Sequence, residues 1–276
     1  MNFPNWIDEA KKLYIQDKKT YKEIGEIYNV SRKTVSKYLR LSGVSSNEKY
    51  VRKINSDKLR KYNYNTCESV FKKIDTEEKA YWLGFLYADG CINIGNSKIE
   101  LFLKEEDIEH LKKYRKFLGL EEKPLFKKEK DGKIGYRFEF SSYVVKDQLA
   151  KLGCLPQKTH ILKFPTEKQV PKKLIHHFIR GYMDGDGCIY VSNNKISLEI
   201  LGTHDFLEGY KNWVNLGNSK IYNFKHSDIK RVCNSNAQAL DILSRIYNNA
   251  NIYLKRKYEK YINFAVQRRK SLKSVE

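Results

Sequence analysis

Cysteine is scarce in this sequence. The chain of 276 residues has five, Cys67, Cys91, Cys154, Cys188 and Cys233. They are scattered and no two form a C-x-x-C pair, which argues against a zinc site. So low a density also argues against a disulfide framework, and a reducing, intracellular setting fits better.

Long hydrophobic runs are missing as well. No stretch reaches the roughly 18 consecutive apolar residues that a transmembrane helix needs. The opening residues, MNFPNWIDEAKK, lack the charged-then-apolar pattern of a secretory signal. We therefore expect an intracellular protein, in the cytoplasm, nucleoid or an organelle, that is neither secreted nor associated with a membrane.

Apolar residues are nevertheless sufficient for a core, and positive charge is in large excess. Hydrophobic residues make up 41% of the chain, which excludes global disorder. Lys and Arg number 53 against 33 Asp and Glu, a net charge of +20. Because the cations are spread along the whole chain, they predict a basic surface that follows a phosphate backbone. A membrane-surface protein is the alternative, but no long basic amphipathic helix supports it.

Residues 1–44 are predicted to form a small all-α unit. The segment TYKEIGEIYNVSRKTVSKYL has apolar residues at helical spacing, among them Ile24, Ile27 and Val35. Asn29 tolerates a left-handed turn, and Ser31 is a natural N-cap. The segment resembles a DNA-binding helix-turn-helix, in which the second helix would present Arg32, Lys33, Ser36 and Lys37 to a major groove. A helical hairpin with a solvated face is the alternative.

The rest of the chain is predicted to be a linker followed by an internal repeat. Residues 45–75 are polar and basic and are interpreted as the linker. Residues 76–165 and 166–276 each follow the order helix, strand, strand, helix, strand, strand, helix. Asp186 follows Asp89 by 97 residues, and Gly181 follows Gly84 by the same interval. The fold class is therefore α/β (α+β), with two pseudo-symmetric αββαββα repeats.

The two repeats share a motif, WLGFLYADG at residues 82–90 and IRGYMDGDG at residues 179–187. Small residues four apart, Gly84 and Ala88 in one helix and Gly181 and Gly185 in the other, let two helices pack closely. Asp89 and Asp186 would then lie together at the helix C-termini, which already carry partial negative charge. A divalent cation would relieve their repulsion. Two unrelated Asp-Gly turns are the alternative.

Over residues 76–266 the motifs resemble those of single-chain LAGLIDADG homing endonucleases. The resemblance implies a saddle-shaped monomer that cuts both strands of a long, asymmetric DNA site, the activity of intron homing. It implies that Asp89 and Asp186, with Gly90 and Gly187, bind Mg²⁺, for which Mn²⁺ substitutes. The earlier acid position, not a metal ligand in the family, holds Tyr87 in the first copy and Asp184 in the second.

The resemblance also implies a basic residue late in each repeat. Lys158 and Lys257 fit this place, and each would orient water or offset charge at the phosphate. Lys255 and Arg256 compete with Lys257, and ordinary surface lysines are the alternative.

Exposed strand residues are expected to contact DNA, because amide, hydroxyl and guanidinium groups suit base edges and phosphates. Alternation predicts that Ile92, Ile94, Ile189 and Val191 face the helices. The candidate contacts on the strands and their turns are Asn93, Lys98, Arg137, Tyr190, Ser192, Asn194, Lys225 and Arg231.

Other functions stay open at this level. A DNA-binding transcriptional regulator without cleavage would use the same scaffold, but gains nothing from two acids facing phosphates. An intron RNA maturase fits the charge equally well, with intron RNA as its partner. An intein is disfavoured by the first and last residues. The neighbouring His176 and His177 are expected to point in different directions on a helix and to make poor joint metal ligands.

Overall fold

The structure is a computed structural model that describes residues 3–17, 19–42, 44, 67–130, 132–215, 220–224 and 227–273. The chain divides into two compact units, Met1–Asn65 and Thr66–Glu276. Residues 45–66 of the predicted linker lie outside the described residues. Of its remaining residues, Val70, Phe71 and Ile74 are buried in the hydrophobic core of the second unit.

The first unit consists of α1 (Ile7–Ile15), α2 (Tyr21–Ile27) and α3 (Arg32–Leu41). Side-chain caps set the starts of α2 and α3. Thr20 and Glu23 form a capping box at α2, and the Ser31 hydroxyl accepts from the Thr34 amide at α3. Asn29 adopts φ 52° between the two helices, which confirms the predicted left-handed turn.

A small core holds these three helices together. It contains Ile7, Ala10, Tyr14, Ile24, Val35 and Leu39. Gly25 lets α2 approach the following turn, because a Cβ there would lie 2.5 Å from the carbonyl oxygen of Val30. Ile27 was predicted on the apolar face but is 50% exposed, since it occupies the last helical position, where the chain turns away.

The second unit contains the two predicted repeats. The first comprises η1 (Cys67–Ser69), α5 (Glu77–Asp89), β1 (Gly90–Ile92), β2 (Lys98–Lys104), η2 (Glu105–Asp107), α6 (Ile108–Phe117), β3 (Phe126–Lys130), β4 (Lys133–Ser141) and α7 (Tyr143–Lys151). After η3 (Lys158–His160), which ends the first repeat, the second comprises η4 (Lys172–Leu174), α8 (Ile175–Asp186), β5 (Gly187–Ser192), β6 (Lys195–Gly202), α9 (His204–Val214), β7 (Tyr222–Phe224), β8 (Ser227–Ser235), α10 (Ala237–Tyr247) and α11 (Lys255–Lys273). The order αββαββα is therefore confirmed in both.

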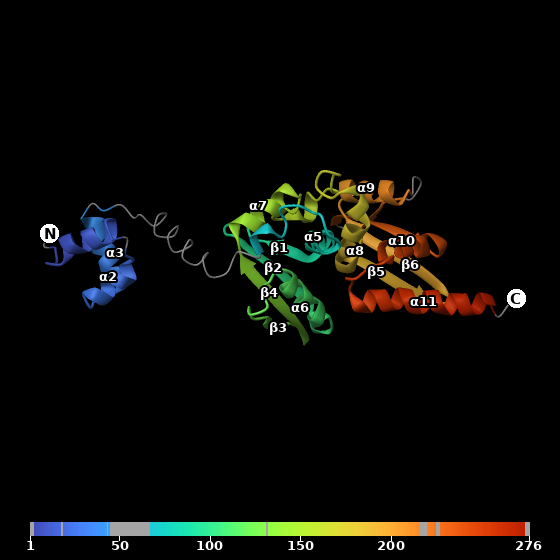
Figure 1. The fold of residues 1–276 in the computed structure, drawn as a ribbon, viewed down its shortest axis with the longest axis horizontal. Helices are drawn as coiled ribbons and strands as arrows, with labels where there is room; N and C mark the ends of the chain where they lie inside the picture. Colours follow the sequence, from blue (N-terminus) through green and yellow to red (C-terminus); the bar gives the residue numbers. More distant parts are fainter. Residues whose placement is uncertain are drawn as a thin grey trace. The chain divides into compact units, whose positions relative to one another are not determined.

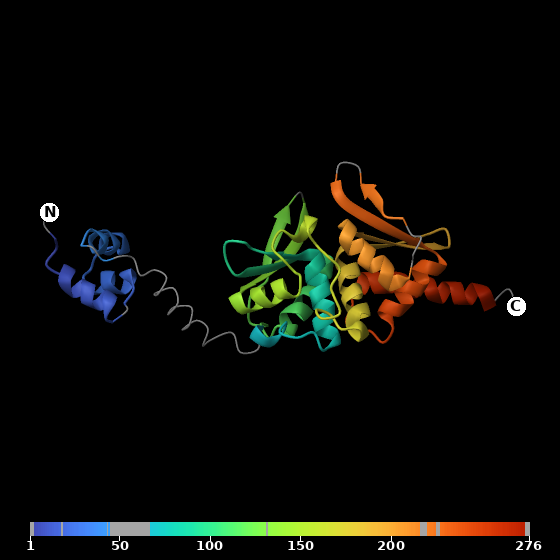
Figure 2. The same ribbon diagram turned by 90° about the horizontal axis from the view of Figure 1, so that it is seen from above.

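Each repeat builds one antiparallel four-stranded sheet. The strand orders are equivalent, β1-β2-β4-β3 and β5-β6-β8-β7. Helices α5 and α8 lie side by side between the two halves (Figures 1 and 2). The buried residues of both repeats form one continuous core across this helix pair. Among the described helices, none combines the length and apolar composition needed to cross a membrane.

Of the four strand residues predicted to face the helices, two do not. Ile92 and Ile189 are buried, but Ile94 is 61% exposed and Val191 is 45% exposed. β1 ends at Ile92, and Ile94 lies in a turn whose carbonyls accept from the Lys146 ammonium. Val191 lies near the hairpin tip of an edge strand, where the core no longer covers it.

A buried histidine in the first repeat makes the unit sensitive to acid. The Tyr81 hydroxyl donates to Asp184, so His110 donates to it from Nε2, at 2.8 Å. Burial lowers the pKa of His110 to about 3, with help from Lys113 and Arg256. Below about pH 6.5 the His110 side chain is protonated in the unfolded chain but stays neutral in the folded chain. The free energy of unfolding therefore falls as the pH decreases from 6.5 toward 3.

We expect His110→Phe to remove this part of the acid sensitivity. Between pH 7.5 and 5.0 the free energy of unfolding of the wild type should fall by about 2 kcal/mol relative to the variant. Urea titrations of both proteins at several pH values measure the difference. Parallel pH profiles would contradict the assignment.

Candidate active centre

The centre is built on the interface between α5 and α8. Gly84 and Gly181 make this interface possible, because a Cβ on either would overlap the backbone of the facing helix. The atoms in the way include the amide nitrogens of Tyr182 and Phe85, each 2.9 Å from the added carbon. Ala88 and Gly185 continue the contact toward the helix ends, where a Cβ on Gly185 would lie 3.2 Å from Oδ2 of Asp89. All four predicted interface residues thus lie at the helix contact.

Asp89 and Asp186 are the last residues of the two helices. Each is followed by a glycine whose amide closes the helix on the carbonyl of Leu86 or Met183. Both glycines have ordinary negative φ, so conformational freedom is not the reason for them. A Cβ would instead lie about 2.5 Å from those carbonyl oxygens, too close for any side chain.

The two aspartates affect each other at the helix ends, where Asp89 is exposed and Asp186 is half-buried. Desolvation by the surrounding protein raises the pKa of Asp89, while Lys257 and Lys158 act to lower it. The pKa of Asp186 is raised to about 6 by burial and then by the charge of Asp89. The hydroxyl of Tyr182 lies beside Asp186 and favours its charged form. The carboxylates therefore repel each other at the negative ends of two helices.

Two lysines reach the same helix ends. Lys257 is only 4% exposed, and its ammonium contacts the carbonyl oxygens of Met183 (2.8 Å), Asp184 (2.6 Å), Gly185 (3.1 Å) and Gly187 (2.5 Å). Lys158, which is half-buried, donates to the carbonyl of Gly90. Each lysine satisfies carbonyls that a helix end leaves unpaired and brings positive charge near the aspartates.

The neighbours that competed with Lys257 point elsewhere. Lys255 is exposed and lies 3.7 Å from Glu259. Arg256 donates from Nε to both oxygens of Asp107, at 3.0 Å, and so joins α11 to the first repeat. Of these three cations, Lys257 is the one that reaches the end of α8.

The carboxylate and carbonyl oxygens at the two helix ends are suitable ligands for a hard divalent cation. In the described part of the chain, no three side chains of His, Cys, Asp or Glu gather as a metal centre. A cation between Asp89 and Asp186 would thus take its other ligands from water or a phosphate, the arrangement Mg²⁺ commonly has in proteins. The predicted ligands Gly90 and Gly187 already accept from the lysines, and each carbonyl keeps a second lone pair.

A cavity of about 230 Å³ opens beside this centre. Lys158 and Asp186 line it from opposite repeats, together with Tyr87, Ala88 and Tyr182. An anionic group that entered the cavity would therefore meet an ammonium and, with a cation present, the metal as well.

The predicted contacts that lie within strands point away from the core, namely Lys98, Arg137, Tyr190, Ser192 and Arg231. Lys98 donates to Glu139 at 3.1 Å, and Nε of Arg137 lies 2.9 Å from the other oxygen of that carboxylate. In the second sheet Arg231 donates to Glu199 at 3.1 Å. These ion pairs hold the cations in place on their faces. Asn93, Tyr190, Ser192 and Asn194 are exposed, and Lys225 lies outside the described residues.

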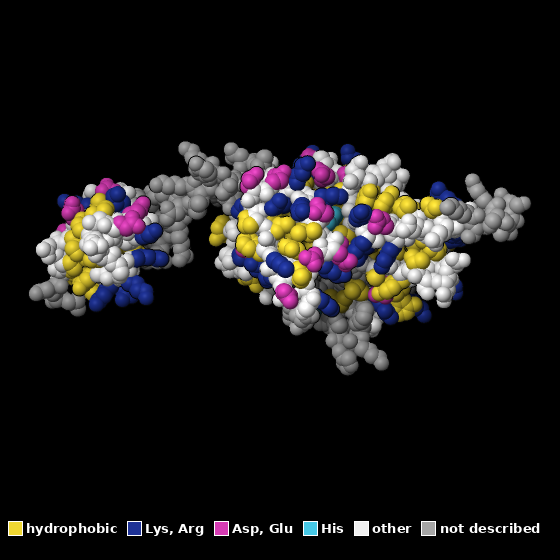
Figure 3. All heavy atoms as spheres, turned by 90° about the horizontal axis from the view of Figure 1, so that it is seen from below, with side chains coloured by type: hydrophobic (Ala, Val, Ile, Leu, Met, Phe, Trp, Pro, Cys, Tyr) yellow, Lys and Arg dark blue, Asp and Glu magenta, His cyan; other side chains and the backbone are white. Residues whose placement is uncertain are grey.

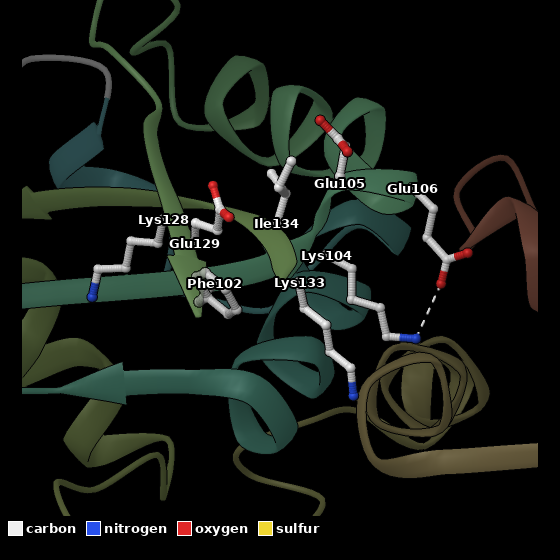
Figure 4. Close-up of a pocket in the computed structure, with 8 residues that line it drawn as sticks. All are labelled: Phe102, Lys104, Glu105, Glu106, Lys128, Glu129, Lys133 and Ile134. Atoms are coloured by element: carbon white, nitrogen blue, oxygen red, sulfur yellow. Dashed lines mark hydrogen bonds and ion pairs between the residues drawn. The ribbon is translucent and has the colours of Figure 1, made fainter. Parts of the chain in front are cut away.

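One part of this surface was not predicted from the sequence. A cavity of about 990 Å³ at one end of the first sheet is lined from β2, β3, β4 and η2 (Figure 4). Phe102 lies over Gly135 and leaves no room for a side chain there. Three lysines and three glutamates line the hollow, and Lys104 donates to Glu106. These residues are Lys104, Lys128, Lys133, Glu105, Glu106 and Glu129. In the space-filling view, Lys and Arg side chains are scattered over the second unit among apolar and acidic ones (Figure 3).

In the first unit, Arg32, Lys33 and Lys37 are exposed on α3, and Ser36 is half-buried.

The expectation that the side chains of His176 and His177 on α8 point in different directions was wrong. Their ring centroids lie 3.8 Å apart, and Arg180 donates to Nδ1 of His177 at 2.9 Å. The two rings are brought together because Arg180 holds His177 against the helix pair, where burial lowers the pKa of His177 to about 4.

The fold and this centre define an α/β protein of two pseudo-symmetric repeats with paired carboxylates at their shared helix interface. No protein-family model matches the chain. Over 133 residues it is 29% identical to a Methanocaldococcus jannaschii protein named Probable translation initiation factor IF-2. This alignment covers 47% of the chain and only 11% of that relative.

Two crystal structures are similar in fold. One is the LAGLIDADG meganuclease I-AabMI bound to uncleaved DNA, with 10% identity, a TM-score of 0.44, and coverage of 67% of this chain and 88% of that one. The other is the I-LtrWI LAGLIDADG homing endonuclease bound to target DNA, with 12% identity, a TM-score of 0.46, and coverage of 69% and 90%.

Proposed function

We propose that this protein is a site-specific DNA endonuclease of the LAGLIDADG type that hydrolyses one phosphodiester bond in each strand. The observation that carries the proposal is the pair of interacting carboxylates at the ends of two packed helices, each end bound by a lysine from its own repeat. A purely structural helix interface gains nothing from placing two like charges side by side.

The residues have separate roles in this proposal. Asp89 and Asp186 hold divalent metal, Mg²⁺ or Mn²⁺, which supplies an activated water and stabilises the leaving oxygen when bound. Lys158 and Lys257 keep the helix ends in place and offset negative charge beside the scissile phosphates. Two repeats in one chain supply two centres, so a monomer would cut both strands of an asymmetric site.

The sheet faces would read the DNA. Their exposed polar residues, including Lys98, Arg137, Tyr190 and Arg231, suit base edges and phosphates. The hollow around Phe102 adds an apolar contact for a thymine methyl group and lysines for the backbone. Helix α3 of the first unit would place Arg32, Lys33, Ser36 and Lys37 against duplex DNA and extend the contact.

Cleavage of a pooled library of long duplexes tests the proposal. With Mg²⁺ we expect double-strand breaks at one sequence, and none when EDTA removes the metal. A protein that binds one sequence tightly and never cuts would instead be a regulator on this scaffold. Preferential binding of structured RNA over the duplex would favour an intron RNA maturase.

Removing one positive charge from α3 tests whether the first unit contacts DNA. We expect Lys37→Ala to weaken binding to the selected duplex and to lower the slope of log Kd against log salt by about 0.9, because one phosphate contact is lost. Fluorescence anisotropy at several salt concentrations measures the slope. Lys11→Ala is the control, since Lys11 is paired with Asp8 at 2.9 Å. An unchanged slope for Lys37→Ala would remove this contact from the proposal.

A further inference from the structure

The short loop before α11 is held by charged groups buried in the helix pair. Asp184 is 1% exposed, and its Oδ2 accepts from the Leu254 amide at 2.7 Å and from the Tyr81 hydroxyl at 2.8 Å. Its Oδ1 accepts from the hydroxyl of Tyr247 at 3.0 Å. The carboxylate therefore joins α5, α10 and the start of α11 at one point.

Arg180, one helical turn before Asp184 on α8, and Glu77 hold the same loop at Asn251 and Ile252. Arg180 is fully buried and donates to the carbonyls of Ile252 (2.8 Å) and Ile246 (2.6 Å), and to Glu77 at 2.6 Å. Glu77, from the first repeat, also accepts from the amide and the side chain of Asn251, each at 2.8 Å. Buried charges with this many partners hold a backbone in one position.

The loop held in this way leads directly to Lys257. Helix α11 begins at Lys255, immediately after the loop, and its first turn carries Lys257 to the carbonyls that end α8. The amide of Lys257 itself bonds to the carbonyl of Leu254 at 3.0 Å, the residue that Asp184 holds. Any movement of Leu254 would therefore move the ammonium relative to Asp186.

The first repeat is built differently at the same places. At the repeat interval of 97 residues, Leu83 corresponds to Arg180, Tyr87 to Asp184 and Leu174 to Glu77. All three are uncharged. Tyr87 donates to the Leu152 carbonyl, and Cys154 to that of Leu86, ahead of the half-buried Lys158. The charged arrangement thus belongs to one half of a pseudo-symmetric molecule.

From this difference we infer that Glu77, Arg180 and Asp184 form a positioning clamp that fixes Lys257 alone and makes the two cleavage centres unequal. The inference rests on the proposed nuclease function. The centre that contains Lys257 is preassembled, so it cuts its DNA strand first. The centre that contains Lys158 cuts the other DNA strand afterwards. None of the three clamp residues needs to touch DNA.

The clamp can be tested without any cleavage, by amide hydrogen exchange in the full-length protein. We expect Asp184→Asn to speed exchange of the Leu254 amide at least about tenfold, because a neutral amide with one acceptor oxygen replaces the charged carboxylate whose two oxygens accept three hydrogen bonds. Exchange at Leu162, whose amide bonds to the Lys158 carbonyl in the first repeat, should stay within about twofold. Tyr87→Phe, at the matching position of the first repeat, is the control and should leave Leu254 unchanged.

Strand-resolved cleavage tests the consequence for the centres. With each strand of the selected duplex labelled separately, we expect Asp184→Asn to slow one strand at least about tenfold and the other less than about twofold. Nicked duplex would then accumulate. A merely structural role for Asp184 would slow both strands in the same proportion, since it would change only the amount of folded protein.

The outcomes separate the clamp from the nuclease proposal. Unchanged exchange at Leu254, or faster exchange with both strands affected alike, would overturn the clamp. A wild type that never cuts would overturn the nuclease function, and hydrogen exchange would still decide whether the loop is held. If Asp184→Asn does not fold, Tyr247→Phe removes a single donor and should shift the strand ratio in the same direction to a smaller extent.

Discussion

Asp89→Asn and Asp186→Asn should each reduce double-strand cleavage at least about 100-fold, while binding to the same duplex stays within a few-fold. Either change removes one of the two carboxylates that face each other at the helix ends and keeps the volume of the side chain. With an amide in place of one carboxylate, the remaining acid faces less repulsion, and the protein loses much of its attraction for a divalent cation. Separate assays of cleavage and binding, both with Mg²⁺, measure the two effects.

The control for this pair is Asp241→Asn. Asp241 is an exposed acid on α10, 3.5 Å from Arg245, and its substitution should leave cleavage unchanged. A second readout follows from electrostatics, because less repulsion should leave apo Asp89→Asn at least as stable to heat as the wild type. Full cleavage by either aspartate variant would remove the twin carboxylates from the mechanism.

The repeated framework could be predicted from the sequence because it depends on local signals. The shared motif marked the ends of α5 and α8, and the small residues at four-residue spacing marked their contact. Strand alternation held where helices cover the sheet and failed at Ile94 and Val191. Those two residues lie in a turn and at a hairpin tip, where period-two alternation no longer tells which side is covered.

The clamp could not be predicted by the same reasoning, because its residues resemble ordinary surface charges. Glu77 looks like a favourable acid in the first turn of a helix, and Arg180 like a solvated residue. Their burial depends on the other repeat, through contacts between residues far apart in the chain. A signal did exist, since Leu83, Tyr87 and Leu174 occupy the matching positions. A comparison of the two repeats, position by position, would have found it.

The contact between α5 and α8 should be the part of the fold least tolerant of a larger side chain. We expect Gly181→Ala to destabilise the second unit by about 3 kcal/mol or more, although alanine is the better helix former. The added methyl group would overlap the carbonyl of Tyr81 and lie 2.9 Å from the Phe85 amide nitrogen, and backbone atoms of a packed helix cannot rotate away. Thermal unfolding should show a fall of roughly 10 °C in Tm.

Gly95→Ala is the matched control for this substitution. The nearest atom to a Cβ at Gly95 is Oδ1 of Asn93, 3.8 Å away, so the methyl group has room and Tm should hardly move. Because both aspartates lie on the helices that Gly181 brings together, a partly folded Gly181→Ala protein should also lose cleavage of both strands equally. This outcome differs from the one-strand effect expected of Asp184→Asn. Unchanged stability in Gly181→Ala would mean that the two helices can separate without loss, and that their close contact does not hold the repeats together.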